Sequence, residues 1–444
     1  MNEPTSRSLH TRREFLRTTL LGGAFSLTVP FFLEQTFMTM DALAADSAIQ
    51  TTTGKNGTIL ILLQLAGGND GLNTVIPYAD DAYYRARPKI GLKPNQCLKL
   101  NSYCGLNPRL VGLKSLYDQG HMGLIQGVGY PNPNRSHFRS TEIWATGSDA
   151  NDAEAQGWIG RYFDNCCKGS DPSVGISISR EVPQTFAANE PRGISFMQPE
   201  QFRYKKESAS DPTSVDSFYR VLQQPGGDAG GVGSNEGGSI GAISGSAPAD
   251  GSSLDYLRRT ALDAQVSSDR ILEISRKQKS LVDYPKSQLA NNFNLIGRLI
   301  AGGMPTRVYY LSQGGYDTHS GQQGTHDRLM GDLDGALCAF VEDLKKQGNL
   351  GRVVIMTFSE FGRRMEENAS GGTDHGAAAP LFVLGGGVHP GLYGRYPSLT
   401  QLQDGDLVFN TDFRSLYATL LEKWLNVPSD KVLKRKFPLM PFLT

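Results

Sequence analysis

The chain has 444 residues, with 44 basic and 44 acidic side chains, so its formal net charge is zero. This balance gives no reason to expect nucleic acid or an anionic membrane surface as a partner. The five cysteines are odd in number and lack Cys-x-x-Cys spacing, which argues against a disulfide framework and a thiolate metal site. An oxidising compartment would still allow a single bridge between Cys97 and Cys104.

The N-terminal segment has the pattern of a targeting signal. The pair Arg12 and Arg13 is followed by a moderately apolar stretch over 18–33 and by a small-x-small cleavage signal, Ala-Leu-Ala, at 42–44. This pattern resembles a twin-arginine signal peptide, so residues 1–44 are predicted to direct export to the periplasm through the twin-arginine export machinery. The alternative is a basic amphipathic helix of the mature protein. The apolar stretch contains glycines, a proline and hydroxyl residues, so no stable membrane span is expected.

The first strand is expected at the start of the mature domain, 45–444. Residues 57–65 form a continuous apolar run of strand length, and the glycine-rich turn 66–71 follows with Asp70 inside it. A carboxylate directly after a buried strand is a common active-site layout in α/β hydrolytic enzymes. Asn-Asp-Gly is also ordinary turn chemistry, so Asp70 has a purely structural alternative.

A second strand is predicted over 122–128, followed by a loop and a helical segment. Arg135 and Ser136 lie where this helix would begin. Unpaired N–H groups and the positive end of the helix dipole favour an anion there and lower the cost of an alkoxide. Ser136 is therefore the candidate nucleophile, with Ser140 in reserve, and Arg135 would steer the anion. The alternatives are a helix N-cap and a surface charge.

The middle of the chain, from about 150 to 305, has the character of an insertion. Residues 174–178 are a strand candidate, and a helical apolar stripe runs over 289–300. Between them, residues 223–253 consist largely of Gly, Ser, Ala and Asp. Such a segment cannot bury enough apolar surface to offset its ordering entropy, so a flexible insertion is predicted.

The next strand candidate, 307–311, leads into a glycine-rich turn that carries Asp317 and His319. Residues two apart in an extended chain point to the same side, so both side chains would face one ion. A carboxylate with an imidazole suits zinc, manganese or iron better than calcium or magnesium. An amphipathic helix is predicted over 327–345.

The stretch 352–387 contains two more apolar runs, 353–356 and 381–384, which fit strands buried on both faces. Glu360 follows the first run, and His375 precedes the second. The two side chains are expected to face each other across the crevice at the carboxyl ends of the strands. A last helix is predicted over 412–425.

Strand, glycine-rich turn, then an acidic residue or histidine is therefore a recurring pattern. It favours an α/β fold with a doubly wound mixed sheet flanked by helices, whose turns meet in one crevice. Carboxylates and imidazoles are costly to desolvate together unless a cation neutralises them, so a metal site is the simplest explanation. A hydrogen-bonded polar network in a binding cleft is the alternative.

Long motifs in the chain also resemble those of a known family. The motifs are LLQLAGGNDGLNTVIPY, YPNPNRSHFRSTEIWATG, GGYDTHS, FSEFGRR and GGTDHGAAAPLFVLGGG. They are similar to the bacterial domain-of-unknown-function 1501 family, which is placed with alkaline phosphatases and sulfatases. The resemblance implies an alkaline-phosphatase-like fold and a metal-dependent site for a phosphate or sulfate ester. By position, it implies metal ligands at Asp70, Asp317, His319, Glu360 and His375, and a nucleophile at Ser136.

The sequence also departs from the pattern of those relatives. Phe361 stands where the second metal's Asp-His pair would place its histidine, and a phenyl ring cannot bind a metal. Asp317 and His319 are closer in sequence than the usual phosphatase ligands. No serine lies in a phosphatase or sulfatase nucleophile motif. One metal ion fits this pattern better than two.

The leading hypothesis is an exported, metal-dependent hydrolase-like protein that binds zinc or manganese and acts on a small anionic phosphate or sulfate ester. The rival hypothesis is a non-catalytic exported binding protein that keeps the fold with a degenerate site. A third, an oxidoreductase, has only the export signal in its favour, because the sequence has no dinucleotide fingerprint, haem motif or cluster cysteines.

Overall fold

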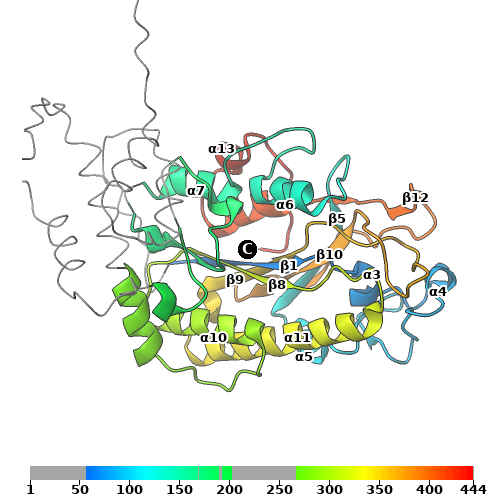
Figure 1. The fold of residues 1–444 in the computed structure, drawn as a ribbon, viewed down its shortest axis with the longest axis horizontal. Helices are drawn as coiled ribbons and strands as arrows, with labels where there is room; N and C mark the ends of the chain where they lie inside the picture. The colour runs from blue at the N-terminus through cyan, green and yellow to red at the C-terminus, as the bar shows by residue number, and fades with distance from the viewer. Residues whose placement is uncertain (1–56, 169, 190–192, 203–266, 444) are drawn as a thin grey trace, which may run out of the picture.

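The computed structural model describes residues 57–168, 170–189, 193–202 and 267–443. The predicted signal peptide, 1–44, and the predicted insertion, 223–253, lie outside these ranges. The described residues form a central sheet between two layers of helices (Figure 1). Within the described ranges, no helix has the length and apolarity needed to cross a membrane.

The sheet is mixed and mostly parallel, in the order β11-β5-β10-β9-β1-β8-β6-β7, with β14 paired to β5. Strand β10 runs antiparallel to both of its neighbours, β5 and β9, while the pairs on either side of this group are parallel. The strands are β1 (Ile59–Ala66), β5 (Met122–Gly129), β6 (Gly175–Ile178), β7 (Ile194–Ser195), β8 (Val308–Gly314), β9 (Val353–Phe358), β10 (Ala379–Gly385), β11 (Gly391–Tyr393) and β14 (Thr411–Asp412). This arrangement confirms the predicted fold class.

Strand β1 shows why the apolar runs become central strands. Its side chains alternate between two hydrophobic cores, with Ile61 and Leu63 in one and Leu60 and Leu62 in the other. Both faces of the sheet are therefore buried, as a continuous apolar strand requires. The first core lies under α5 (Val111–Asp118), α10 (Gln288–Ala301) and α11 (Gln322–Lys346), and the second under α6 (His137–Thr146), α7 (Trp158–Cys166), α12 (Phe413–Thr419) and α13 (Ser429–Leu433) (Figure 1).

Short elements complete the described chain. Three minor strands, β2 (Val75–Ile76), β3 (Leu98–Lys99) and β4 (Gly105–Leu106), form their own sheet, and β12 (Leu402–Gln403) pairs with β13 (Asp406–Leu407). The short helices α3 (Gly71–Thr74) and α4 (Asp81–Ala86) follow β1. The predicted last helix is observed in two parts, because a π-helical turn over Leu420–Trp424 follows α12.

One local prediction needs correction, and the structure also answers a question that the sequence left open. Helix α11 begins at Gln322, five residues before the predicted start at Asp327, because Gln322 and His326 are buried by polar contacts that an apolar stripe does not reveal. Cys97 and Cys104 are separate buried thiols, whose pKa values burial raises to about 11. The disulfide that the structure contains joins the neighbours Cys166 and Cys167 instead.

Substituting Leu63 by alanine tests the central position of β1. Leu63 is fully buried, so Leu63→Ala is expected to lower the free energy of unfolding by about 2–5 kcal/mol. Leu281, which is 52% exposed, provides the control, and Leu281→Ala is expected to change it by less than about 0.5 kcal/mol. Urea denaturation of the purified variants measures both. Equal losses would contradict the placement of the core.

Candidate metal centre

The sheet topology brings several chain segments to one edge. Strands β1, β5, β8 and β9 all run in the same direction, so their carboxyl ends lie together. Strand β10 runs the opposite way, and the loop that precedes it therefore starts from the same edge. This convergence explains how residues from 67, 137, 317, 360 and 375 come to share one site.

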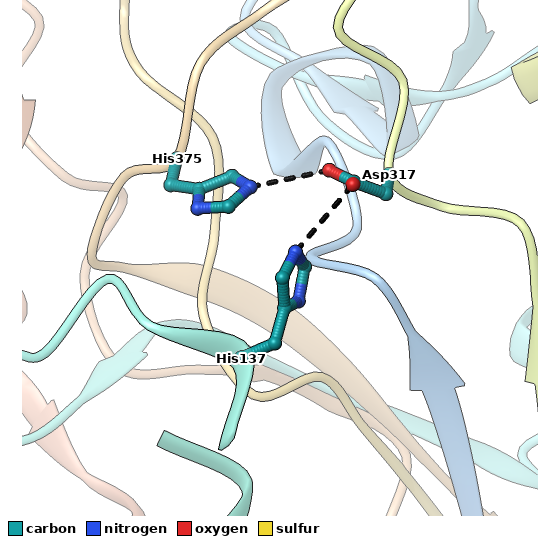
Figure 2. Close-up of side chains that lie close together, drawn as sticks. All are labelled: His137, Asp317 and His375. Atoms are coloured by element: carbon teal, nitrogen blue, oxygen red, sulfur yellow. Dashed lines mark hydrogen bonds and ion pairs between the residues drawn. The ribbon is translucent and has the colours of Figure 1, made fainter. Parts of the chain in front are cut away.

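The core of the site consists of His137, Asp317 and His375 (Figure 2). Each offers one ligand atom, and these atoms all lie within 4.8 Å of one another. The Asp317 carboxylate lies between the imidazoles, with one oxygen 3.5 Å from His137 Nε2 and the other 3.1 Å from His375 Nε2. His137 begins α6, Asp317 follows β8, and His375 precedes β10.

His319 adds a third imidazole to this group. Its Nε2 lies 3.0 Å from Asp317 Oδ1 and 2.9 Å from His375 Nε2. Asp317 is thus in contact with three histidines at once. The predicted ligands Asp317, His319 and His375 are therefore brought together by the structure.

The opposite ring nitrogen of each histidine faces a group that only accepts hydrogen bonds. Nδ1 of His137 lies 2.9 Å from Glu360 Oε1, Nδ1 of His319 lies 3.3 Å from Asp374 Oδ1, and Nδ1 of His375 lies 2.8 Å from the Arg135 carbonyl oxygen. A neutral ring that donates from Nδ1 to this group presents the lone pair of Nε2 to the centre of the cluster. Metal-binding histidines are held in this way, because the second hydrogen bond fixes both tautomer and ring orientation.

Three Nε2 lone pairs directed toward one carboxylate need a positive charge among them. The Nε2 atoms of His319 and His375 are close enough for a hydrogen bond, yet both would be acceptors. Either a proton or a cation must relieve this contact. Imidazole nitrogens with one carboxylate form the donor set that zinc prefers and manganese accepts, so the residues present fit a divalent metal ion.

Glu360 supports this group from behind. Its side chain is almost fully buried, and Oε1 accepts hydrogen bonds from the Gly67 backbone N–H at 2.8 Å and from His137. The second oxygen, Oε2, is buried without a hydrogen-bond partner. The structure thus pairs Glu360 with His137 instead of with His375, and its engaged oxygen orients a ligand from outside the cluster.

Arg363 fixes the position of Asp317. Its guanidinium is fully buried and donates to Asp317 Oδ1 at 2.7 Å. Partial burial works against ionisation of Asp317, but the Arg363 guanidinium, followed by the neighbouring imidazoles of His375 and His319, outweighs it and lowers its pKa to about 2. Asp317 is therefore a carboxylate at any physiological pH.

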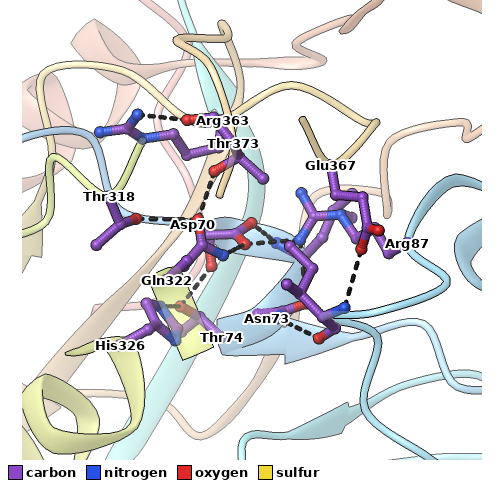
Figure 3. Close-up of polar contacts among 12 residues, drawn as sticks. Asp70, Asn73, Thr74, Arg87, Thr318, Gln322, His326, Arg363, Glu367 and Thr373 are labelled. Atoms are coloured by element: carbon purple, nitrogen blue, oxygen red, sulfur yellow. Dashed lines mark hydrogen bonds and ion pairs between the residues drawn. The ribbon is translucent and has the colours of Figure 1, made fainter. Parts of the chain in front are cut away.

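Asp70, also a predicted ligand, takes part in a separate hydrogen-bond network (Figure 3). Its Oδ2 accepts from Arg87 at 2.6 Å and from the Gln322 side-chain amide, while Oδ1 accepts from the Leu72 backbone N–H. Both oxygens are thus engaged, and the Arg87 guanidinium already neutralises the charge. Asp70 has the surroundings of a structural anchor.

The predicted catalytic residues flank the cluster in the chain. Ser136 is exposed at the N-cap of α6, and its hydroxyl does not cap the helix. The Arg135 guanidinium donates to Asp406 at 2.7 Å, so its charge is already shared with a carboxylate. Ser140, the reserve nucleophile, is fully buried and donates to the Glu360 carbonyl oxygen, which gives it a structural role.

Phe361 fills the space beside the imidazoles. Its ring centroid lies 4.9 Å from that of His137 and 4.5 Å from that of His375. The ring also lies close to Gly68, where an added Cβ would be 2.4 Å from a ring carbon. Phe361, at the position that the resemblance assigns to a second metal's histidine, therefore packs against the imidazoles and offers no ligand atom.

His137 is the site residue that the sequence analysis missed. It follows strand β5 by a short loop, so it obeys the same pattern of strand, turn and histidine as the predicted ligands. The role of Asp374 as the partner of His319 was equally invisible, because the two are 55 residues apart.

Comparisons with known proteins agree with the resemblance in the motifs. The family model described as "Protein of unknown function (DUF1501)" matches residues 255–435, which confirms the family resemblance. No curated protein matches the chain.

Several solved structures align with most of the chain at low identity. A protein in the alkaline phosphatase superfamily from Vibrio parahaemolyticus is 10% identical with a TM-score of 0.36, and the alignment covers 91% of this chain and 78% of that one. The C-terminal periplasmic domain of EcEptC from Escherichia coli, in complex with Zn, is 9% identical with a TM-score of 0.29 and coverage of 74% and 73%. The PsFucS1 sulfatase from Pseudoalteromonas sp. is 13% identical with a TM-score of 0.31 and coverage of 78% and 66%.

Replacing Arg363 tests how strongly the site depends on it. The Arg363 guanidinium also donates to buried backbone carbonyl oxygens, those of Gly68, Tyr316 and Thr373. Arg363→Met is therefore expected to lower the free energy of unfolding by at least about 3 kcal/mol, because each buried carbonyl left without a donor costs roughly 1–3 kcal/mol. Arg328 on α11 is the control, since its side chain is 63% exposed and its guanidinium lies 3.5 Å from Asp332. Arg328→Met should cost less than about 0.5 kcal/mol. Urea denaturation distinguishes the two, and similar values would refute the central role of Arg363.

Proposed function

We propose that this protein is a metal-dependent hydrolase-like protein that acts on a small anionic phosphate or sulfate ester. The observation that carries the proposal is the orientation of three histidines, whose Nδ1 atoms are held by acceptors while their Nε2 atoms converge on Asp317. With their protons on Nδ1, the Nε2 atoms of His319 and His375 lie 2.9 Å apart as two acceptors, a contact that a cation relieves. The ester class comes from the family resemblance in the motifs.

His137, Asp317 and His375 would hold the ion, with His319 beside them. When bound, a divalent zinc or manganese ion polarises an ester oxygen and lowers the pKa of water. Glu360 keeps the His137 ring in the orientation needed for binding. Asp70, although expected as a ligand, contributes from outside the group.

The start of α6 would serve the anionic substrate. Ser136 presents an exposed hydroxyl at the N-cap of α6, where the positive end of the helix dipole favours an anion. Ser136 is accordingly the candidate nucleophile, and water is the alternative. Arg135 shares its charge with Asp406, which leaves a partly exposed guanidinium to attract the ester from solution.

The second candidate function is binding without catalysis. Phe361 favours it, because a ring packed on His137 and His375 removes the place for a second cation. A protein that keeps the group of histidines for a structural ion would hold a ligand in the same crevice and turn nothing over.

Metal content with an ester panel tests the proposal. Purified protein is expected to contain about one equivalent of zinc or manganese and to hydrolyse an aryl phosphate or aryl sulfate. His375→Ala removes one of the converging nitrogens and should lower metal content and turnover at least tenfold. Elemental analysis and release of the aryl alcohol measure these two quantities.

His389→Ala is the matched control, since His389 is exposed and contacts the Pro441 carbonyl oxygen instead of the cluster. It should leave both quantities unchanged. Metal without turnover on any ester would favour the binding protein over the hydrolase. Absence of metal in both the wild type and His375→Ala would reject the metal centre itself.

We further propose that the twin-arginine pattern at Arg12 and Arg13 directs export to the periplasm. Replacing both by lysine keeps the charge but should abolish export, because the pathway requires the arginine pair. Arg17→Lys, outside the pair, is the control and should be exported normally. Fractionation of cells into cytoplasm and periplasm measures the distribution. Undiminished export of the double variant would exclude this pathway.

A further inference from the structure

A chain of buried polar side chains connects segments that neighbour the candidate metal centre in the sequence; Figure 3 shows its hydrogen bonds. Arg87 donates to Asp70, and Asp70 accepts the side-chain N–H of Gln322. The carbonyl oxygen of Gln322 then accepts from Thr318 Oγ1 at 2.9 Å and from Thr373 Oγ1 at 2.6 Å. All five residues are at least about nine-tenths buried.

The two threonines are the chain neighbours of the site residues. Thr318 lies between Asp317 and His319, and Thr373 directly precedes Asp374 and His375. One amide oxygen therefore joins both segments that carry these side chains. The Thr373 N–H also donates to the Thr318 carbonyl oxygen at 3.2 Å, so the two segments form a paired unit.

The charge of Asp70 determines which way this amide points. A flipped amide would place its carbonyl oxygen against the carboxylate, whereas the observed orientation places the NH₂ group there. The orientation of Gln322 then leaves its oxygen for the two threonine hydroxyls. A buried ion pair such as Arg87–Asp70 is weak evidence for stability by itself. Here, however, its carboxylate fixes the orientation of the Gln322 side-chain amide.

Arg87 extends the chain to a third segment. Its guanidinium donates to the carbonyl oxygens of Met365 at 2.9 Å and Arg364 at 2.8 Å, in the stretch directly after Arg363. The chain of side chains thus connects the turn after β1, the paired segments and the loop after β9. These are the parts of the fold that must keep a fixed relation for the histidines to converge.

We infer that Asp70 is a positioning residue, which acts through Gln322 to hold the Asp317–His319 and Asp374–His375 segments at the spacing that a metal ion requires. This role replaces the direct ligation expected from the sequence. The expected effect on zinc affinity rests on the proposed metal centre. The expected effect on hydrogen–deuterium exchange rests on the hydrogen bonds alone.

The test compares Asp70→Asn and Gln322→Leu with the wild type. Asparagine has one carbonyl oxygen and cannot serve both the Leu72 N–H and the donors from Arg87 and Gln322. Each variant is expected to weaken zinc affinity about 10–100-fold, measured by competition with a chromophoric chelator. In the metal-free protein, hydrogen–deuterium exchange should accelerate in 316–322 and 368–375 together.

Two controls separate positioning from general loss of stability. Asp343 is a fully buried carboxylate on α11, the helix that also carries Gln322, and it accepts hydrogen bonds from the Leu281 N–H and the Tyr284 hydroxyl. Asp343→Asn should destabilise the protein but leave zinc affinity and the exchange of those two segments unchanged. At Thr373, serine keeps the hydroxyl and should retain affinity within about twofold, whereas valine should lose as much as Gln322→Leu.

The outcomes are distinct. Wild-type zinc affinity and unchanged exchange in Asp70→Asn and Gln322→Leu would overturn the inference. If wild-type protein binds no zinc, the metal centre is rejected, and the exchange experiment alone decides whether Asp70 and Gln322 hold the two segments. Accelerated exchange throughout the protein, with no excess in these segments, would also overturn it.

Discussion

The Arg363 guanidinium is the interaction on which the geometry of this site depends. Besides the Asp317 carboxylate, it donates to the backbone carbonyl oxygens of Gly67, Gly68, Tyr316 and Thr373. These groups come from the turn after β1, the loop after β8 and the loop before β10. A planar guanidinium has five N–H donors in a fixed arrangement, so it sets the mutual distances of its acceptors. Three loops that are far apart in sequence are thereby held as one body.

The acidic residues around this body have different tasks, which their surroundings assign. Asp317 is half-exposed and meets three imidazoles, so it is placed for a ligand. Glu360 and Asp374 each hold the far nitrogen of one histidine. Asp70 is fully buried against Arg87. A carboxylate can join a metal ion only if an oxygen faces it, and the hydrogen bonds at each position decide whether one does.

The fold was largely predictable, because its main strands are apolar runs buried on both faces. The strands after which Asp70, His137, Asp317 and Glu360 follow were all expected from such runs, and their common edge followed from parallel pairing. The start of α11 was not predictable, because Gln322 does not belong to an apolar stripe. It is buried by hydrogen bonds to Asp70 and Thr373, which lie more than 50 positions away, and to the nearby Thr318.

Site chemistry was harder to predict, since it depends on partners that sequence does not pair. Asp317, His319 and His375 were expected together and lie together. Asp70 was expected with them, but Arg87 occupies it, and no pattern marks that pairing. Glu360 was expected opposite His375, whereas it contacts His137. His137 lies on α6, which follows β5, and β10 separates β5 from β9 in the sheet, so the sequence did not indicate this contact. Residue type and strand end identify candidates; only packing decides their contacts.

Phe361 limits what chemistry this crevice supports. It is buried against Gly68 and the rings of His137 and His375, so it restricts their rotation but supplies no ligand. Among the described residues, one group of three side chains that could hold a metal ion meets closely, and two of its members pack against this ring. The arrangement therefore favours a single ion. In the proposed reaction, the negative charge that develops on the ester would need stabilisation that a second cation does not supply. The helix N-terminus at Ser136 and the guanidinium of Arg135 are placed to provide it, which makes the start of α6 as important as the histidines themselves.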